Sequence, residues 1–184
     1  MRETEERLFR LLLLVNDQQR FAEAKNGALL AVSGASAFGL IASFNDITAV
    51  LPGWRESFIA ASAIFCLSFI ASLLSLLPKT DPAAILKSEH GNPSESDNLC
   101  FFGDLCRYTP KGLVKAINAK HGSTEVADDQ SAGELDIAEQ IIVNSTITSA
   151  KFRSFRTGGW LVVMAIVSIP VVHVCSLIIE RLLR

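Results

Sequence analysis

The chain has 184 residues, 49% of them hydrophobic, and its mean hydropathy of +0.35 is high for a soluble domain. This length allows one or two small domains, and the formal net charge of −2 gives no indication of a nucleic-acid partner. The charged residues are segregated, because none of them lies in the apolar stretches 26–44, 57–77 and 157–179. Such segregation is typical of a membrane protein and argues against an ordinary soluble domain.

The N-terminal residues 1–25 contain neither Gly nor Pro. We expect a cytosolic amphipathic helix here, which can run directly into the first membrane helix. Its apolar residues share one broad face: Leu8, Leu11, Leu12, Val15 and Phe21. Packing of this face on the rest of the cytosolic part is favoured over a lipid-surface anchor, because acidic side chains match the basic ones in number.

The first apolar stretch is long enough to cross a bilayer, since about 20 helical residues at ~1.5 Å each span a hydrocarbon core of ~30 Å. Four small residues in it are each four positions apart: Gly27, Ala31, Ala35 and Gly39. On a helix they form one stripe, along which another backbone can approach closely. We therefore assign this small-residue stripe to contacts between copies of the chain.

A second membrane helix follows after a short link that contains a Pro52-Gly53 turn signal. The brevity of the link forces the two helices into an antiparallel hairpin over residues 26–78. The third membrane helix is expected over 157–180, where the apolar stretch 160–179 follows Gly158-Gly159. Pro170 lies inside it, where membrane helices tolerate proline.

Residues 79–156 are predicted to form a cytosolic helical region. A short helix is expected to begin near Pro110 with Thr109 as its cap, and a long helix is expected over 134–156. The region holds too little apolar material for a core of its own. We therefore expect it to pack against the helices that emerge from the bilayer.

Basic residues near the membrane ends predict the orientation. Most of them flank the start of the first membrane helix or the large insert: Arg20, Lys25, Lys79, Lys151, Arg153 and Arg156. The short link has Arg55 alone. By the positive-inside rule, the N-terminus and the insert lie in the cytosol. The predicted fold class is all-α, an integral membrane protein with about three transmembrane helices and a small cytosolic helical part.

The sequence offers no catalytic set and no metal-ligand spacing, so we expect neither an enzyme nor a cofactor. Three groups of residues suit a nucleotide instead: Lys25 and Asn26; Asn98, Phe101, Phe102 and Gly103; Gln140, Asn144, Lys151 and Arg153. Amides can read a base edge, phenylalanine rings can stack on it, and cations can hold a phosphate. An alternative stays open: the lysines and arginines only set the orientation in the membrane, and the phenylalanines only fill the core.

The order of these features resembles the membrane-spanning Pycsar effector family of bacterial anti-phage systems. The resemblance rests on AEAKNGALLAVSGA, LLSLLPK, NLCFFGDLCRYTPKGLVKAI and IIVNSTITSAKFRSFRTGGWLVV, and it covers about residues 23–172. The most specific piece is 98–104. Seven positions match the motif: Lys25, Asn26, Asn98, Phe101, Phe102, Gly103 and Lys151.

The resemblance implies a multi-pass protein of the bacterial inner membrane that senses a cyclic nucleotide. In such systems a partner cyclase makes the messenger, here most simply a cyclic pyrimidine monophosphate. The effector then disrupts the membrane and stops the cell, an abortive infection. We expect a homo-oligomer in the lipid bilayer. The alternative is a membrane scaffold or regulatory subunit that binds a protein partner through its cytosolic insert.

Overall fold

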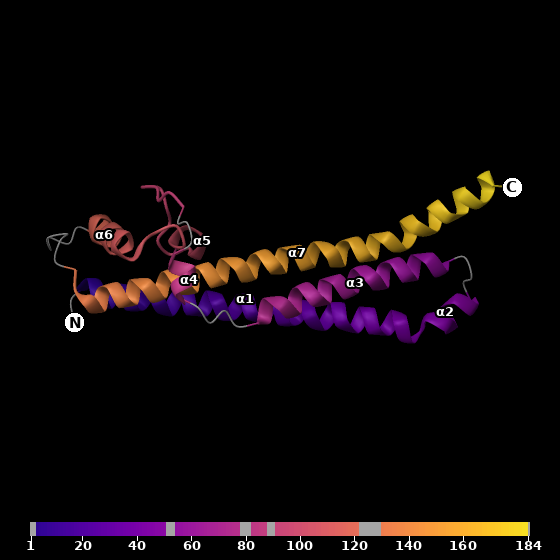
Figure 1. Cartoon of the computed structure of the whole chain (residues 1–184), viewed down its shortest axis with the longest axis horizontal. Helices are drawn as coiled ribbons and strands as arrows, with labels where there is room; N and C mark the ends of the chain where they lie inside the picture. Colours follow the sequence, from indigo (N-terminus) through magenta and orange to yellow (C-terminus); the bar gives the residue numbers. More distant parts are fainter. Residues whose placement is uncertain (1–2, 51–53, 78–81, 88–90, 122–129, 184) are drawn as a thin grey trace. The chain divides into compact units, whose positions relative to one another are not determined.

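The computed structural model describes residues 3–50, 54–77, 82–87, 91–121 and 130–183. It is all-α, as predicted, with no strand among these residues (Figure 1). The helices are α1 (Glu3–Ala42), α2 (Phe44–Val50), α3 (Arg55–Leu76), α4 (Pro82–Lys87), α5 (Phe102–Leu105), α6 (Pro110–His121) and α7 (Ala132–Leu182). The predicted Pro52-Gly53 turn and the orientation-setting Lys79 lie outside the described residues.

Three of the described helices, α1, α3 and α7, are long and apolar enough to cross a membrane, which confirms the predicted number. The chain forms two compact units. Unit 1 comprises Met1–Glu23 and Pro78–Phe152, and unit 2 comprises Ala24–Leu77 and Arg153–Arg184. The most apolar parts of the three helices thus lie in unit 2, and the short helices α4, α5 and α6 lie in unit 1.

The helix α7 is continuous through Gly158-Gly159 and Pro170, so the helix expected over 134–156 runs on into the third membrane-spanning candidate. Glycine lowers helix propensity, but tertiary packing routinely overrides that preference. A side chain at Gly158 would meet Leu29 at 2.8 Å and the Ser72 hydroxyl at 3.3 Å. Gly158 therefore allows the neighbouring helices to approach closely, while α7 continues through it.

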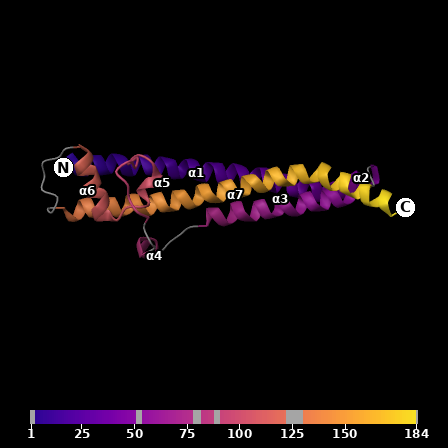
Figure 2. The ribbon, with the colours of Figure 1, turned by 90° about the horizontal axis from the view of Figure 1, so that it is seen from above.

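The three helices of unit 2 meet along small side chains, and α3 runs beside α7 in both views (Figures 1 and 2). The buried small residues are Ser33, Ala37, Ser57, Ala61, Ser68, Ser72 and Ala165. Ser68 Oγ donates a hydrogen bond of 3.0 Å to the Gly158 carbonyl, and Ser154 Oγ donates one of 3.1 Å to the carbonyl of Ala71. Close approach and interhelical hydrogen bonds are what associates helices in lipid, where no hydrophobic force acts between them.

Most of the large apolar side chains of unit 2 point outward, although Phe65 is buried against Ala37 and Ala165. Those exposed include Val32, Phe38, Ile41, Leu67, Ile70, Leu74, Trp160, Val163, Met164, Ile166 and Val167. A water-soluble bundle would bury these residues and expose its serines. The inverted arrangement fits a hydrocarbon solvent.

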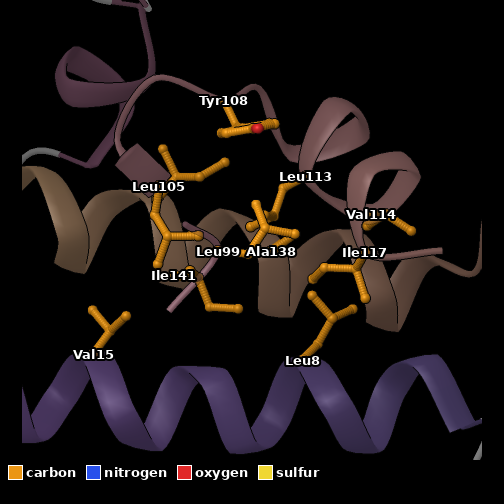
Figure 3. Packing of buried hydrophobic residues seen from close by; sticks show 11 residues of the cluster. Leu8, Val15, Leu99, Leu105, Tyr108, Leu113, Val114, Ile117, Ala138 and Ile141 are labelled. Atoms are coloured by element: carbon orange, nitrogen blue, oxygen red, sulfur yellow. The ribbon is translucent and has the colours of Figure 1, made fainter. Parts of the chain in front are cut away.

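Unit 1 has a conventional hydrophobic core (Figure 3). The first part of α1 contributes Leu8 and Val15, and the first part of α7 contributes Ala138, Ile141 and Ile142. The segment 99–117 supplies the rest: Leu99, Leu105, Tyr108, Leu113, Val114 and Ile117. The insert thus shares one core with the two long helices, because its own apolar residues are too few to form a separate one.

The glycine pair on α7 allows a matched test of the packing in unit 2. Gly158→Leu should destabilise the bundle by about 1–3 kcal/mol, because its Cβ would overlap Leu29. Gly159→Leu is the control, since no atom lies within 4 Å of a Cβ placed there. Thermal unfolding of both variants in detergent micelles measures the difference. Equal midpoints would contradict the close packing at Gly158.

Candidate functional site

The segment from Asn98 to Asp104 closes on itself as a compact loop. The Asn98 backbone N–H donates to Asp104 Oδ2 at 3.0 Å, and Asn98 Oδ1 accepts the N–H of Cys100 at 3.0 Å. Leu99 is buried in the core of unit 1. At Gly103 a Cβ would collide with the ring of Phe101, so glycine is required for the ring to lie there. The motif residues therefore shape a loop that presents two phenylalanines.

The two phenylalanines of the loop join a row of four aromatic rings. Phe102 stacks on Phe152 of α7, with ring centroids 5.0 Å apart and planes at 10°. Phe101 lies 4.6 Å from Phe102, and Phe21 of α1 lies 6.4 Å from Phe152. The inner rings are therefore used in packing, whereas the outer two are 44% (Phe101) and 56% (Phe21) exposed. Of these four rings, the outer two have the exposed surface on which a base could stack.

Lys151 adjoins this aromatic row, and its charge is already matched. Its Nζ donates to Glu23 Oε1 at 2.6 Å, and its side chain is only 14% exposed. The Lys151 hydrogen bond lowers the pKa of Glu23, and burial of the carboxyl opposes this only in part. The ion pair consequently stabilises unit 1 at neutral pH, and this stabilisation is lost as the pH falls through the lowered pKa. An anionic ligand at Lys151 must compete with this carboxylate.

Asn144 makes a second polar contact between the same two helices. Its Nδ2 donates to Asn16 Oδ1 at 2.8 Å. This pair and Glu23–Lys151 are both separated by 128 residues in sequence. A constant separation means that α1 and α7 run parallel within unit 1. Gln140, also predicted as a ligand residue, lies one turn earlier on α7 and is exposed.

The predicted ligand residues are divided between the two units. Phe101, Phe102 and Lys151 belong to unit 1, where Phe102 stacks on Phe152. Lys25, Asn26 and Arg153 belong to unit 2. There Lys25 Nζ lies 5.4 Å from the centroid of Phe155, as a cation–π contact, Asn26 is fully buried, and Arg153 is exposed. Their assignment to one ligand site stays a prediction.

The sequence interpretation missed the partners of the predicted residues. These are Asn16, Phe21, Glu23 and Phe152. One signal could have revealed two of them: Asn16 and Glu23 are seven residues apart on α1, and Asn144 and Lys151 are seven apart on α7. A shared spacing of seven is typical of paired parallel helices.

The small-residue stripe of α1 lies outside the packed seam of unit 2. Ala31, Ala35 and Gly39 are exposed, and no atom lies within 4 Å of a Cβ placed at Gly27 or Gly39. The face that packs within one chain carries Ser33, Gly34 and Ala37 instead. The stripe is thus open in a single copy, and its role between copies stays a prediction.

The Glu23–Lys151 pair can be tested by exchanging its charges. Lys151→Glu should lower the stability of unit 1 by about 1–3 kcal/mol, because it places two carboxylates together in a partly buried site. Combining it with Glu23→Lys should restore most of that loss. Arg10→Glu, at an exposed pair with Glu6, is the control and should cost under about 1 kcal/mol. Thermal unfolding followed by circular dichroism measures each; a double variant no better than Lys151→Glu alone would refute the pairing.

Most of the chain is similar to known proteins. The family model of the Pycsar effector protein domain, PycTM, matches residues 7–179. The chain is also 29% identical, over 161 residues, to the Pycsar effector protein RsPycTM of a Rhizobium species. That similarity covers 86% of this chain and 89% of the relative. No solved structure matches. The family match spans both units, and the chain therefore belongs to the Pycsar effector family of membrane-associated antiviral-defence proteins.

Proposed function

We propose that this protein is activated by a cyclic nucleotide second messenger and then disrupts the inner membrane, so that the infected cell stops before phage matures. The observation that supports this most is the family match over residues 7–179, which includes all three membrane-spanning candidates. The messenger in the proposal is a cyclic pyrimidine monophosphate from a partner cyclase. The protein acts on the bilayer physically and not as an enzyme.

The proposed orientation is multi-pass with a cytosolic N-terminus. Lys25 and the basic end of the 134–156 segment favour the cytosolic side, against Arg55 alone in the link. Unit 1 then lies in the cytosol, where a nucleotide made inside the cell can reach it.

Activation requires two arrangements of the protein that differ in affinity for the messenger. A ligand that binds both equally shifts neither. Moving the population from about 1% active to about 99% active takes roughly a 10⁴-fold preference, or about 5.5 kcal/mol. A single phosphate contact is worth less than that, so in our proposal the gain is shared between ligand contacts and contacts among assembled copies.

Leakage of dye from liposomes that contain the purified protein tests the function. We expect release on addition of cyclic UMP or cyclic CMP, because only the cyclic pyrimidine monophosphate shifts the population to the active arrangement. We expect no release with linear 5′-UMP or with lipid vesicles that lack the protein. If none of the cyclic nucleotides causes release, the membrane-disrupting function is wrong and the scaffold alternative gains.

The small-residue stripe supplies a test of assembly. Ala35→Leu should reduce nucleotide-triggered leakage about tenfold or more, because a leucine on the stripe keeps two backbones from close approach. Ala63→Leu is the matched control: it is the same substitution on an exposed membrane position of α3. Both variants should insert normally, since both positions are exposed in a single chain. Equal leakage from both variants would show that the small-residue stripe is not needed for assembly.

A further inference from the structure

Unit 1 contains a cavity that none of the predicted ligand residues lines. It lies between α6 and the segment 93–99, and its volume is about 450 Å³. Small-molecule sites typically measure about 300–1,000 Å³. The cavity is therefore large enough for a mononucleotide.

One wall of the cavity is a flat strip on α6. Gly112, Ala116 and Ala119 line it at helical spacings of four and three, so they share one face. The neighbouring face of α6 carries Leu113, Val114 and Ile117 into the core (Figure 3). Leu99 and the ring of Tyr108 also line the cavity. A planar ring can lie against such a strip without meeting a large side chain.

The cavity also carries fixed polar groups. Lys120 Nζ donates to the Asp97 carbonyl at 2.7 Å, and the Tyr108 hydroxyl donates to the Ser94 carbonyl at 3.3 Å. Burial, and then the nearby Asp97, raises the pKa of Tyr108, so its hydroxyl remains a donor at neutral pH. These bonds hold the segment 93–99 against α6 and shape the opening.

The cavity is lined by charges of both signs, the acids Glu95 and Asp97 and the cations Lys115 and Lys120. The Asp97 carboxylate accepts the Ser94 N–H at 2.8 Å and lies 3.4 Å from the Arg107 guanidinium, which is itself shared with Asp104 at 3.5 Å. Among the described residues, no carboxylate is paired with Lys115. A cyclic monophosphate, which carries a single negative charge, would supply a counter-charge for Lys115.

We infer that this cavity is the binding site of the cyclic nucleotide, an assignment that rests on the proposed function. The base lies against the strip of Gly112, Ala116 and Ala119, and the cyclic phosphate is bound by Lys115 and Lys120. Glu95 accepts a hydrogen bond from a ring N–H or exocyclic amine of the base. A purely apolar ligand would leave Lys115 without a counter-charge, so the lysine favours an anionic ring compound.

The site is connected to the motif loop through the chain itself. Leu99 lines the cavity and belongs to the core, and it is the second residue of the loop from Asn98 to Asp104. The same loop stacks Phe102 on Phe152 of α7. A ligand that holds the segment 93–99 against α6 thus biases the position of the loop on α7. In this assignment the motif transmits the signal, and the phenylalanines do not themselves bind the base.

Direct binding to the full-length protein in lipid nanodiscs tests the site. Equilibrium dialysis with radiolabelled cyclic UMP and cyclic CMP gives the affinity. Lys115→Glu and Ala119→Phe should each weaken binding at least tenfold, the first by charge and the second by filling the cavity. Lys111→Glu is the matched control: it lies one turn earlier on α6, is exposed and does not line the cavity. All three positions are exposed, so circular dichroism should show unchanged thermal unfolding.

Each outcome decides the assignment. Loss of binding in both cavity variants, with Lys111→Glu unchanged, supports it. If the wild type and both cavity variants bind equally, the site is wrong although the proposed function stands. Loss of binding with Phe101→Ala alone moves the ligand to the aromatic row and overturns the assignment too. Absence of binding by the wild type overturns the assignment together with the proposed function.

Discussion

The parallel pairing of α1 with α7 is the constraint on which unit 1 depends. Two polar contacts at the same sequence separation, Asn16–Asn144 and Glu23–Lys151, hold the helices in one register. That register brings Leu8 and Val15 into one core with Ala138 and Ile141, and the insert closes this core from the side. A buried polar pair contributes little net stability, but a mismatched one is costly, so its main effect is to exclude other registers.

Unit 2 has the opposite distribution of side chains from unit 1. Its seam consists mainly of serine, alanine and glycine, with Phe65 among them, and most of its large apolar side chains face outward. Hydroxyls of Ser68 and Ser154 supply the specific contacts by donating to backbone carbonyls of a neighbouring helix. The helices α1 and α7, which each contribute to both units, are therefore adapted to a different solvent in each part of their length. Leucines are buried in unit 1, which water surrounds, and serines are buried in unit 2, which hydrocarbon surrounds.

The sequence predicted the features that depend on local pattern. It indicated the three membrane helices, the continuity of α1 and the cap of α6, where Thr109 Oγ1 accepts the N–H of Gly112. It did not reveal the partner of Lys151, because Glu23 lies 128 residues away and pairing depends on the register of two helices. It did not reveal the close packing at Gly158 either, since a glycine that ends a helix and one that a neighbouring helix approaches look alike in sequence. The cavity on α6 went unnoticed for a related reason: it exists only where the strip of Gly112, Ala116 and Ala119 faces the segment 93–99.

The two polar pairs have a consequence for exchanging parts between relatives. A slip of one heptad would set Lys151 against Asn16 and leave Glu23 without its cation. A chimera that takes α1 from one protein and α7 from another therefore combines polar residues from two sources. It folds well only if those residues pair in the same register. In this chain the two helices, although far apart in sequence, have to be exchanged together.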